Sequence, residues 1–382
     1  MWILLFIALI LILLDALMLL RLGSGLVKAS DFLISEPDLH SRNSGRPAPE
    51  GAGKVTLIVP FRNEIRHLPR IVKDLEAQTW PEDGVEFILV NDHSEDGSGS
   101  WAQAYVRGRA RFSYMELTES ERGKKSALAA GVRSARGDWI IQTDADCSLG
   151  PEFVAAHMAA RSTTGADLVA GLVTTQKGKN GILERLERLD LLGLAGVAAG
   201  SFALGRPLLC SGANLSYSRE LYLGTRAYDP VAEVASGDDM FMMIGARKLG
   251  GTLVYLTAPE AVVSTEPVGS LQALVRQRIR WGAKAGRYRM PDIQAVALLT
   301  LLTHFVLLLM PWLIWLRPEV WVWLIPGFAA RTFAQWLLLY RTAGYTGQRC
   351  DLWMFLPVLL FYYPFMALVM TGSLFKKGKW KY

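Results

Sequence analysis

Long apolar runs lie near both ends of the chain, and shorter apolar runs alternate with polar stretches between them. The long runs are residues 2–20, 295–316 and 352–375. Because an α-helix rises about 1.5 Å per residue, each run is long enough to cross a hydrocarbon core about 30 Å thick. The first run carries one charge, Asp15, and the other two carry none. The pattern predicts an N-terminal transmembrane helix at residues 1–22 and C-terminal transmembrane segments within residues 291–375.

The number of C-terminal spans, two or three, stays open. A weaker candidate at residues 320–340 is interrupted by Arg331 and Gln335. Three spans would place the basic tail, residues 376–382, outside, whereas two would place it inside, where basic residues are favoured. We favour three hydrophobic segments without deciding whether the middle one crosses fully. Asp15 is costly at membrane depth, so we expect it to pair with another helix or to be tolerated at a helix interface.

Between residues 54 and about 260, short apolar runs alternate with helical stretches. The strand-like runs are Val55–Phe61, Glu86–Asn91, Trp139–Thr143 and Leu168–Val173. The helical candidates lie near residues 64–78, 97–108 and 124–136. This alternation predicts an α/β fold with a mostly parallel sheet covered by helices.

We expect one α/β domain at residues 54–290, since about 240 residues can bury a full core. Residues 23–53, rich in Ser, Pro and Gly toward their end, are expected to be a linker. Residues 181–204 combine a charged start with small apolar residues. That composition fits a helix lying on the membrane surface and equally a helix packed on the sheet.

Composition and charge narrow the class of protein. The chain has 382 residues, 51% hydrophobic and 20% charged, with a formal net charge of +6. These values exclude a disordered, collagen-like or disulfide-dense protein. The basic residues cluster beside the apolar runs, at residues 276–289 and in the tail, where anionic headgroups attract them. We therefore expect a membrane partner and no nucleic acid. Basic residues after the first run favour a cytosolic α/β domain in an integral protein of the plasma membrane.

Polar motifs follow the first two predicted strands. Residues 59–64 read Val-Pro-Phe-Arg-Asn-Glu, and residues 90–98 form an acidic turn that contains Gly97. The carboxyl ends of parallel strands border the crevice where such sheets bind ligands, so both motifs are candidates for a binding site. Turns rich in Asp, Ser and Gly also occur without a ligand, so neither motif is specific alone.

A pair of carboxylates follows the third predicted strand. Asp144 and Asp146 are two residues apart in a loop, where both can reach one hard cation. Oxygen ligands suit Mg²⁺ or Mn²⁺, and such an ion can bridge to a diphosphate. Two solvated acids in a loop are the alternative for this motif taken alone.

Two further motifs lie later in the chain. Asp238 and Asp239 precede an apolar helical stretch, where they also fit a simple helix start. About forty residues later, Gln277, Arg280 and Trp281 lie three and four residues apart, on one helical face. A guanidinium suits a diphosphate and an indole suits stacking on a sugar or base. A basic amphipathic helix on the membrane is the alternative, and both descriptions are compatible.

In this order and spacing, the motifs resemble those of membrane-bound family 2 glycosyltransferases. The segment at residues 122–128 resembles the family's basic GK-S-A-L stretch, and residues 212–214 resemble its G-A-N motif. The resemblance covers residues 54–290. It implies the GT-A fold, a Rossmann-like, mostly parallel sheet with helices on both faces, flanked by N-terminal and C-terminal transmembrane helices.

The resemblance also implies a donor site. Asp92 would contact the uracil of a UDP-sugar, and Lys124 would position part of the donor. The residues that would shape the nucleotide pocket are Pro60, Arg62 and Glu64. Asp144 and Asp146 would bind Mg²⁺ or Mn²⁺, with Asp144 also close to the donor.

Catalysis and acceptor binding are assigned in the same way. Asp239 would be the general base, and Asp238 replaces the family's usual glutamate. The residues that would close over the diphosphate and the acceptor end are Gln277, Arg280 and Trp281. Those on the acceptor side would be Gly212, Asn214 and Trp281.

The implied activity is transfer of a sugar, with inversion, from a UDP-sugar to a membrane-embedded lipid, giving a glycolipid. The alternative is a processive polysaccharide synthase of the chitin, hyaluronan or poly-N-acetylglucosamine type. About four apolar helices are few for a secretion channel, unless the chain forms a homo-oligomer or has a partner. A transporter or scaffold with a nucleotide-binding domain is a third hypothesis, from a different class.

Overall fold

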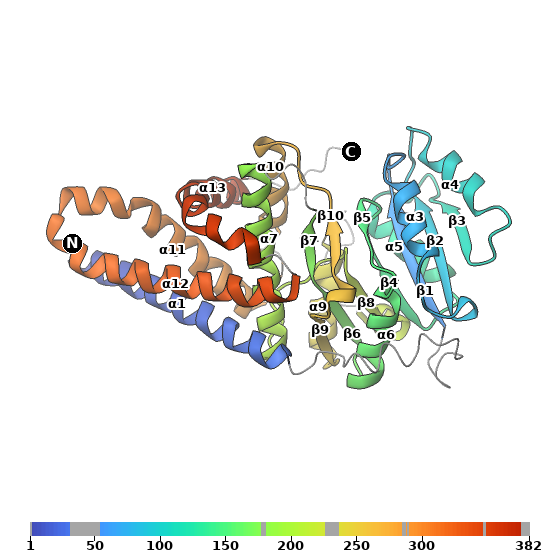
Figure 1. The fold of residues 1–382 in the computed structure, drawn as a ribbon, viewed down its shortest axis with the longest axis horizontal. Coiled ribbons are helices and arrows are strands. Elements are labelled where there is room, and N and C mark those ends of the chain that lie inside the picture. Colours follow the sequence, from blue (N-terminus) through green and yellow to red (C-terminus); the bar gives the residue numbers. More distant parts are fainter. Residues whose placement is uncertain are drawn as a thin grey trace. The chain divides into compact units, whose positions relative to one another are not determined.

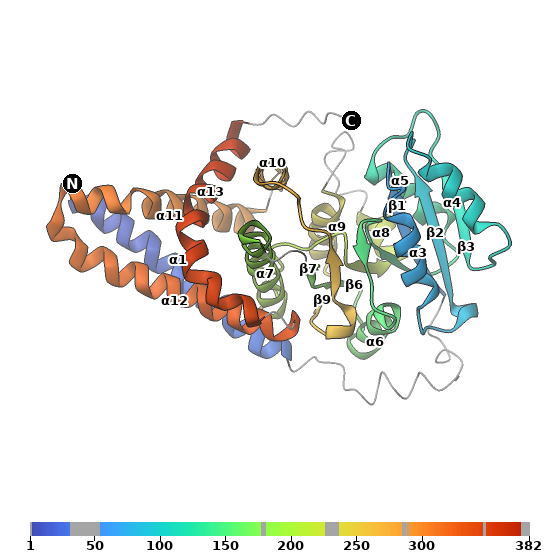
Figure 2. The same cartoon turned by 45° about the horizontal axis from the view of Figure 1, so that its top comes forward.

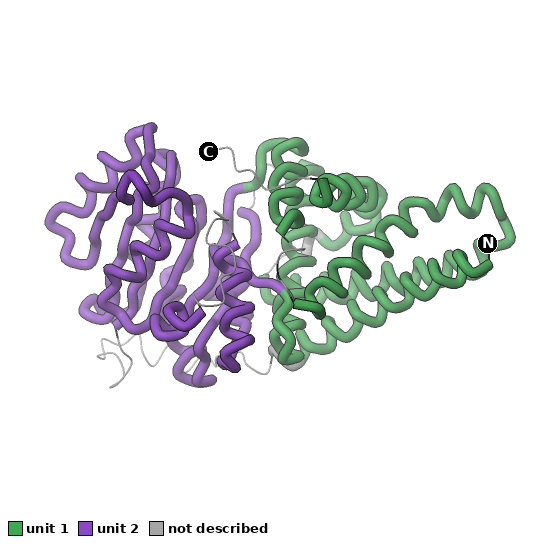
Figure 3. Tube along the Cα trace, turned by 180° about the vertical axis from the view of Figure 1, so that it is seen from behind, with its two compact units in different colours: residues 1–28, 177–208, 267–382 green, residues 29–176, 209–266 purple. Residues whose placement is uncertain are grey.

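The structure is a computed structural model that describes most of the chain. The described residues are 2–30, 54–176, 181–225, 237–284, 288, 290–346 and 349–375. Most of the expected linker and the basic tail lie outside them. The chain divides into two compact units, drawn in different colours in Figure 3. The helical unit comprises residues 1–28, 177–208 and 267–382, and the α/β unit comprises residues 29–176 and 209–266. The helical unit thus takes in two segments that we expected within the α/β domain.

The α/β unit is built on a seven-stranded sheet in the order β3-β2-β1-β4-β8-β6-β9 (Figure 1). Its strands are β1 (Val55–Phe61), β2 (Val85–Asn91), β3 (Phe112–Glu116), β4 (Trp139–Gln142), β6 (Leu168–Gly171), β8 (Leu215–Ser218) and β9 (Leu253–Leu256). Strands β3, β2, β1 and β4 are parallel, β8 runs antiparallel to both of its neighbours, and β9 is parallel to β6. The mostly parallel α/β fold expected from the sequence is confirmed.

A second, three-stranded sheet has the order β5-β10-β7. Its strands are β5 (Cys147–Ser148), β7 (Val173–Thr175) and β10 (Val263–Thr265). Strand β10 pairs antiparallel with β5, directly after the Asp144–Asp146 loop, and parallel with β7. This sheet therefore brings the end of β10 to the loop that carries both predicted metal ligands.

Helices cover both faces of the large sheet, since β1 and β2 are buried at every position. The helices of this unit are α3 (Leu68–Glu76), α4 (Ser98–Val106), α5 (Lys124–Ser134), α6 (Phe153–Thr164), α8 (Arg219–Thr225) and α9 (Asp238–Lys248). On one face, Leu57 shares a core cluster with Ile71 of α3. On the other face, Ile58 lies so close to Gly131 of α5 that an added Cβ would come within 2.7 Å of it.

The helical unit contains α1 (Trp2–Ser30), α7 (Ile182–Ala203), α10 (Leu271–Gly282), α11 (Pro291–Leu316), α12 (Trp321–Thr346) and α13 (Phe355–Phe375). Within the described residues, four segments are long and apolar enough to cross a membrane: Trp2–Val27, Pro291–Leu316, Pro318–Thr346 and Leu352–Phe375. Helix α7 packs against α1, where an added Cβ on Gly25 would lie 2.5 Å from the Gly200 carbonyl oxygen. The sequence left open whether residues 181–204 pack on the sheet; α7 belongs to the helical unit.

A buried ion pair joins α1 to α12. Arg331 donates from Nε to Asp15 Oδ2 at 3.0 Å and from Nη1 to the Tyr363 hydroxyl of α13 at 3.1 Å. Arg331 Nη1 also donates to Gln335 one turn along α12. Asp15 and Arg331 are 1% and 3% exposed. Of the two alternatives that the sequence left open for Asp15, the structure shows the pairing with another helix, and the residues that interrupt the 320–340 run face the interior of the unit.

Replacing one partner of this pair should destabilise the helical unit strongly. Asp15→Leu leaves the Arg331 guanidinium buried without its counter-charge, which costs about 3–5 kcal/mol. The double variant Asp15→Leu/Arg331→Met removes both charges and should recover most of that loss. Thermal unfolding of the purified protein in detergent compares the three forms. Equal melting temperatures for the single and double variants would contradict the assigned pair.

Candidate active site

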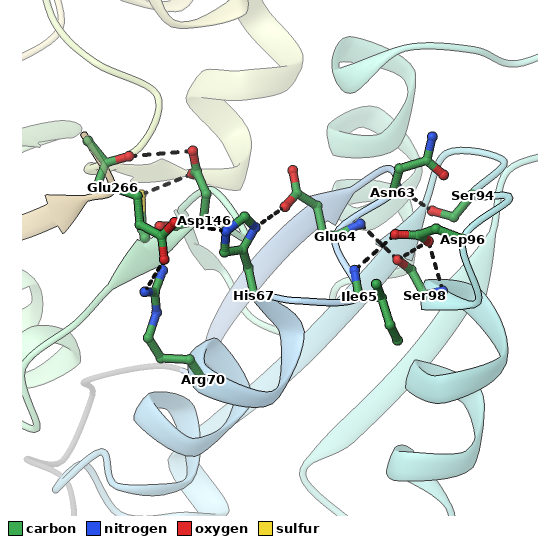
Figure 4. Close-up of polar contacts among 12 residues, drawn as sticks. Asn63, Glu64, Ile65, His67, Arg70, Ser94, Asp96, Ser98, Asp146 and Glu266 are labelled. Atoms are coloured by element: carbon green, nitrogen blue, oxygen red, sulfur yellow. Dashed lines mark hydrogen bonds and ion pairs between the residues drawn. The ribbon is translucent and has the colours of Figure 1, made fainter. Parts of the chain in front are cut away.

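The loops that follow β1 and β2 are tied together by side-chain hydrogen bonds (Figure 4). The backbone N–H of Glu64 donates to Ser98 Oγ at 2.8 Å, and that of Ile65 donates to Asp96 Oδ2 at 3.1 Å. Asn63 accepts from the Glu95 N–H at 2.8 Å and has a φ of 58°, in the left-handed region that Asn tolerates best among non-glycine residues. The two polar motifs recognised in the sequence therefore form one connected rim at the strand ends.

A charged cluster extends this rim toward the end of β10. The His67 ring bonds to Glu64 through Nδ1 and to Glu266 through Nε2, the latter at 3.2 Å. Arg70 Nη1 donates to Glu266 Oε1 at 2.7 Å, and Nη2 donates to the Asp146 carbonyl oxygen at 2.7 Å (Figure 4). Arg70 therefore braces the backbone of the Asp144–Asp146 loop.

The pKa values of Glu64 and His67 are raised, whereas the pKa of Glu266, despite its partial burial, is lowered by hydrogen bonds from Arg70 and His67. Burial raises the pKa of Glu64 despite its bond to His67. Burial alone would lower the pKa of His67, but its bonds to both glutamates raise it. The histidine thus carries more positive charge near neutral pH than a free imidazole, which suits its place between two carboxylates.

Lys124 is the counter-charge of the acidic centre. Its ammonium group forms an ion pair with Asp144. Burial alone would lower the pKa of Lys124, but the charges of Asp144, Asp238 and Asp239 raise it. Lys124 is the first residue of α5, directly after Gly123. Its attraction to Asp144 after β4 and to Asp238 and Asp239 of α9 connects these three elements electrostatically.

The candidate general base lies in the first turn of α9. The Gly212 backbone N–H donates to Asp239 Oδ2 at 3.1 Å, which orients that carboxylate. A Cβ added to Gly212 would lie 2.8 Å from Gln142 Nε2 and 3.5 Å from both Asp239 Cβ and Lys124 Nζ. A side chain at 212 would therefore occupy the space between the base and the lysine.

Asp238 and Asp92 each carry a buried oxygen without a hydrogen-bond partner among the described residues: Oδ2 of Asp238 and Oδ1 of Asp92. Burial raises the pKa of Asp238, and the nearby Asp239 adds to the effect, while Lys124 opposes it. Asp92 uses Oδ2 to accept from the Gly123 N–H at 3.0 Å. Its other oxygen can accept a hydrogen bond from a ligand, which fits the predicted contact with a base edge.

The residues near the loop fit a divalent cation that is shared with a ligand. Burial raises the pKa of Asp146, and the negative charge of Asp144 adds to the rise, so the two carboxylates are close. Among the described residues, no group of three or more His, Cys, Asp or Glu side chains could hold a metal ion. Two carboxylates that leave the remaining positions to phosphate oxygens and water match the usual protein contribution to a Mg²⁺ site.

Asn214, predicted on the acceptor side, is fully buried and bonded within the protein. Its Nδ2 donates to the carbonyl oxygens of Leu172 and Ala261, both at 2.8 Å. Its Oδ1 accepts from His157 Nε2 at 2.9 Å, and His157 Nδ1 then accepts from Ser216 Oγ at 2.8 Å. The amide therefore positions the strands behind Gly212, while Gly212 itself faces the acidic centre.

The remaining predicted residues lie on α10, in the helical unit. Gln277 accepts from Arg278, and the Arg278 guanidinium lies 4.3 Å from the centre of the Trp281 ring. Arg278 also donates from Nε to Asp190 Oδ2 of α7 at 2.6 Å. Arg280 and Trp281 are exposed. The geometry thus brings together Gln277 and Trp281 around Arg278 and leaves Arg280 on the surface of the helix.

Several residues that contact the predicted site were not singled out from the sequence, and four of them carry an ionisable side chain that pairs with another charged group. They are His67, Arg70, Glu266 and Arg278. Arg278 lies inside a recognised motif and could have been considered. Glu266 is almost two hundred residues from its partners, and no local pattern marks it.

Known proteins resemble this chain in sequence and in fold. Residues 56–222 match the family model described as Glycosyl transferase family 2. This part of the chain is thus similar to glycosyl transferases of family 2. A solved structure, the mannosyltransferase PcManGT from Pyrobaculum calidifontis in complex with GDP-Man and Mn²⁺, aligns with a TM-score of 0.54 at 19% identity. The alignment covers 94% of this chain and 100% of that one, and it shows that the two share the GT-A-like fold.

Curated relatives match a shorter stretch. Glycosyltransferase AglE from Haloferax volcanii is 25% identical over 119 residues, 31% of this chain and 39% of AglE. An undecaprenyl-phosphate 4-deoxy-4-formamido-L-arabinose transferase from Pseudomonas aeruginosa is 29% identical over 119 residues, 31% of this chain and 35% of that enzyme. The chain therefore spans little more than a third of the length of these relatives.

The buried His157 should make stability depend on pH. Burial lowers the pKa of His157 to about 4, from an ordinary value of 6.5, so the unfolded chain binds a proton more readily than the folded one. The neutral, buried His157 contributes fully to the free energy of unfolding above pH 6.5. As the pH falls toward 4, this free energy decreases by about 3 kcal/mol.

Unfolding free energies of wild type and His157→Gln, measured between pH 4 and 7, test this assignment. Glutamine offers a donor and an acceptor without titrating, so the slope should be smaller in the variant. Identical slopes would show that other groups cause the pH dependence.

Proposed function

We propose that this protein is an inverting, metal-dependent glycosyltransferase that moves a sugar from a UDP-sugar to a membrane lipid. The observation that carries the proposal is the convergence of Lys124, Asp144, Asp238 and Asp239 at the carboxyl end of the parallel strands. A single site there holds a candidate base, a cation-binding carboxylate and a fixed positive charge. Those are the groups that sugar transfer from a nucleotide diphosphate requires.

The donor would lie along the rim formed by the first two motifs. The unpartnered Oδ1 of Asp92 would accept a hydrogen bond from the uracil N–H. The residues that shape the nucleotide pocket in this proposal are Pro60, Arg62 and Glu64. Arg70 and His67 would hold this rim in place through Glu266 and Glu64, so they would position donor-binding groups without touching the sugar.

The reaction would be a single displacement. Asp239 would accept the proton of the acceptor hydroxyl, whose oxygen attacks the anomeric carbon as the bond to UDP breaks. The Gly212 N–H holds the carboxylate in a defined orientation for this step. Asp144 and Asp146 would hold Mg²⁺ or Mn²⁺, which supplies positive charge to the departing diphosphate. Lys124 would stabilise the same charge.

A lipid acceptor fits the helical unit and the relatives. Within the described residues, four helices are apolar and long enough to span a bilayer, so an amphiphile could present its hydroxyl or phosphate from the membrane. The Pseudomonas relative is named for transfer to undecaprenyl phosphate. We propose that the acceptor is a membrane lipid with a hydroxyl or phosphate headgroup, a class that includes polyprenyl phosphates. Gly212 would face the acceptor.

The test of the activity is UDP release by the full-length protein with a panel of UDP-sugars, Mn²⁺ and vesicles of total membrane lipid. We expect release that depends on lipid and that EDTA abolishes. Mass spectrometry of the extract should show one added sugar on a lipid. A ladder of sugars would instead identify a polysaccharide synthase, and no release with any donor or lipid would favour a transporter or scaffold.

Removing the proposed base should separate binding from chemistry. Asp239→Asn keeps the hydrogen bond from Gly212 but cannot take up the proton, so turnover should fall by about 10²–10⁴-fold. UDP-sugar affinity, measured by calorimetry, should stay within a few-fold of wild type. Asp83→Asn, an exposed acid in the turn before β2, is the matched control. Turnover of Asp239→Asn equal to that control would exclude Asp239 as the base.

A further inference from the structure

Helix α13 differs in direction from the other apolar helices of its unit. In Figure 2, α1, α11 and α12 run alongside one another, whereas α13 runs across them. Figure 1 agrees, since α13 occupies only a short part of the length that the other three share. Length and composition alone would make Leu352–Phe375 a fourth span. Its direction within the helical unit argues against this.

Both ends of α13 pack against the same pair of charged helices, α7 and α10. Near its start, Val358 shares a core cluster with Leu186 and Leu189 of α7. At its end, Ser373 Oγ donates to the Ile279 carbonyl oxygen of α10 at 3.3 Å, and an added Cβ on Gly372 would lie 2.5 Å from Ile279 Cδ1.

Helices α7 and α10 are themselves joined by two polar contacts. Arg278 of α10 is paired with Asp190 of α7, and the Val268 N–H before α10 donates to Glu187 of α7 at 2.9 Å. Arg276 and Arg280 are exposed on α10, and exposed guanidinium groups do not lie in hydrocarbon. Because α7 and α10 are in direct contact with each other, a helix with both ends on them stays beside this pair along its length.

The face of α13 turned away from α7 and α10 is apolar. Its exposed side chains form a stripe at helical spacing: Leu356, Leu360, Phe361, Leu368 and Phe375. On the covered side of α13, the Tyr363 hydroxyl accepts a hydrogen bond from Arg331 of α12. Helix α13 therefore packs directly against the other helices of the unit. A continuous exposed apolar stripe on a helix whose other face is covered marks a surface that contacts lipid.

We propose that α13 lies in one leaflet as an interfacial helix, with its exposed stripe inserted among the acyl chains, and does not cross the bilayer. The lipid leaflet covers this apolar face, and the same leaflet surrounds α1, α11 and α12. Four lysines follow α13 in the sequence, Lys376, Lys377, Lys379 and Lys381, and anionic headgroups at that boundary attract them. The structure assigns three crossings, α1, α11 and α12.

This topology resolves the disagreement between the side that the basic tail favours and the side that three C-terminal spans would give it. After three crossings, the chain beyond α12 lies on the side where α1 ends, together with the basic residues that follow α1. The lysine-rich tail then also stays on that side, as the positive-inside rule requires. Helix α10, with Gln277, Arg280 and Trp281, is held at the membrane surface by the helix beneath it. The proposal concerns membrane placement and does not depend on the proposed chemistry.

Insertion depth along α13 tests the proposal. Single cysteines replace Leu356, Leu360, Leu368 and Leu374, one at a time, in full-length protein that carries Cys350→Ser; the buried Cys147 and Cys210 stay. Each variant is labelled with an environment-sensitive fluorophore in vesicles of phosphatidylcholine and phosphatidylglycerol at 3:1, and lipids with nitroxides at two depths quench it. We expect similar, shallow depths at all four positions.

Helix α12 supplies the matched control. Trp323→Cys, Phe333→Cys and Tyr340→Cys replace exposed residues along a crossing helix, so their depths should be shallow, deep and shallow. The same shallow-deep-shallow profile along α13 would overturn the proposal.

Sidedness gives a second, independent measurement. In sealed cells, a membrane-impermeant maleimide should label Glu319→Cys, in the turn between α11 and α12. It should label Lys381→Cys only after permeabilisation. Labelling of Lys381→Cys in sealed cells would show that α13 crosses, whatever the activity of the protein.

Discussion

The attraction between one ammonium group and several carboxylates organises the candidate active site. Asp144 comes from the loop after β4, and Asp238 and Asp239 come from the first turn of α9. Bringing like charges together in a partly desolvated place is unfavourable unless an opposite charge is shared among them. Lys124 supplies that charge, and its raised pKa records the attraction of all three acids. A diphosphate with its cation would enter a site where the charges are already arranged.

The same electrostatic principle holds the helical unit together. Among the buried arginines of the described residues, Arg278 and Arg331 each donate to a buried aspartate from another helix. Tyrosines of α13 complete both sites, Tyr362 on Asp190 and Tyr363 on Arg331. Because each charge has its partner, these residues can lie among apolar helices without water. The helix that carries Gln277, Arg280 and Trp281 is thereby fixed to α7 and α13.

Much of the fold could be predicted from local pattern. Strand β1 has the predicted bounds, and β2, β4 and β6 differ only at their ends, because buried parallel strands are continuous apolar runs. Strand β8 was missed because Leu215–Ser218 is too short for its alternation of apolar residues with serines to be distinctive, and its buried Ser216 is bonded to His157 of a distant helix. No local period reveals such a partner.

The sequence by itself marked the candidate residues for the chemistry: the strand-end motifs, the Asp144–Asp146 pair, the two acids before α9 and the face of α10. These are short-range patterns, and residue type and spacing suffice to recognise them. Only the tertiary structure decided which groups support them, as His67, Arg70 and Glu266 do, and that Asn214 is buried behind the site. It also decided that α13, apolar enough to span, packs at both ends on charged helices. Such contacts join residues far apart in the chain, and their energies depend on burial and distance, which composition does not contain.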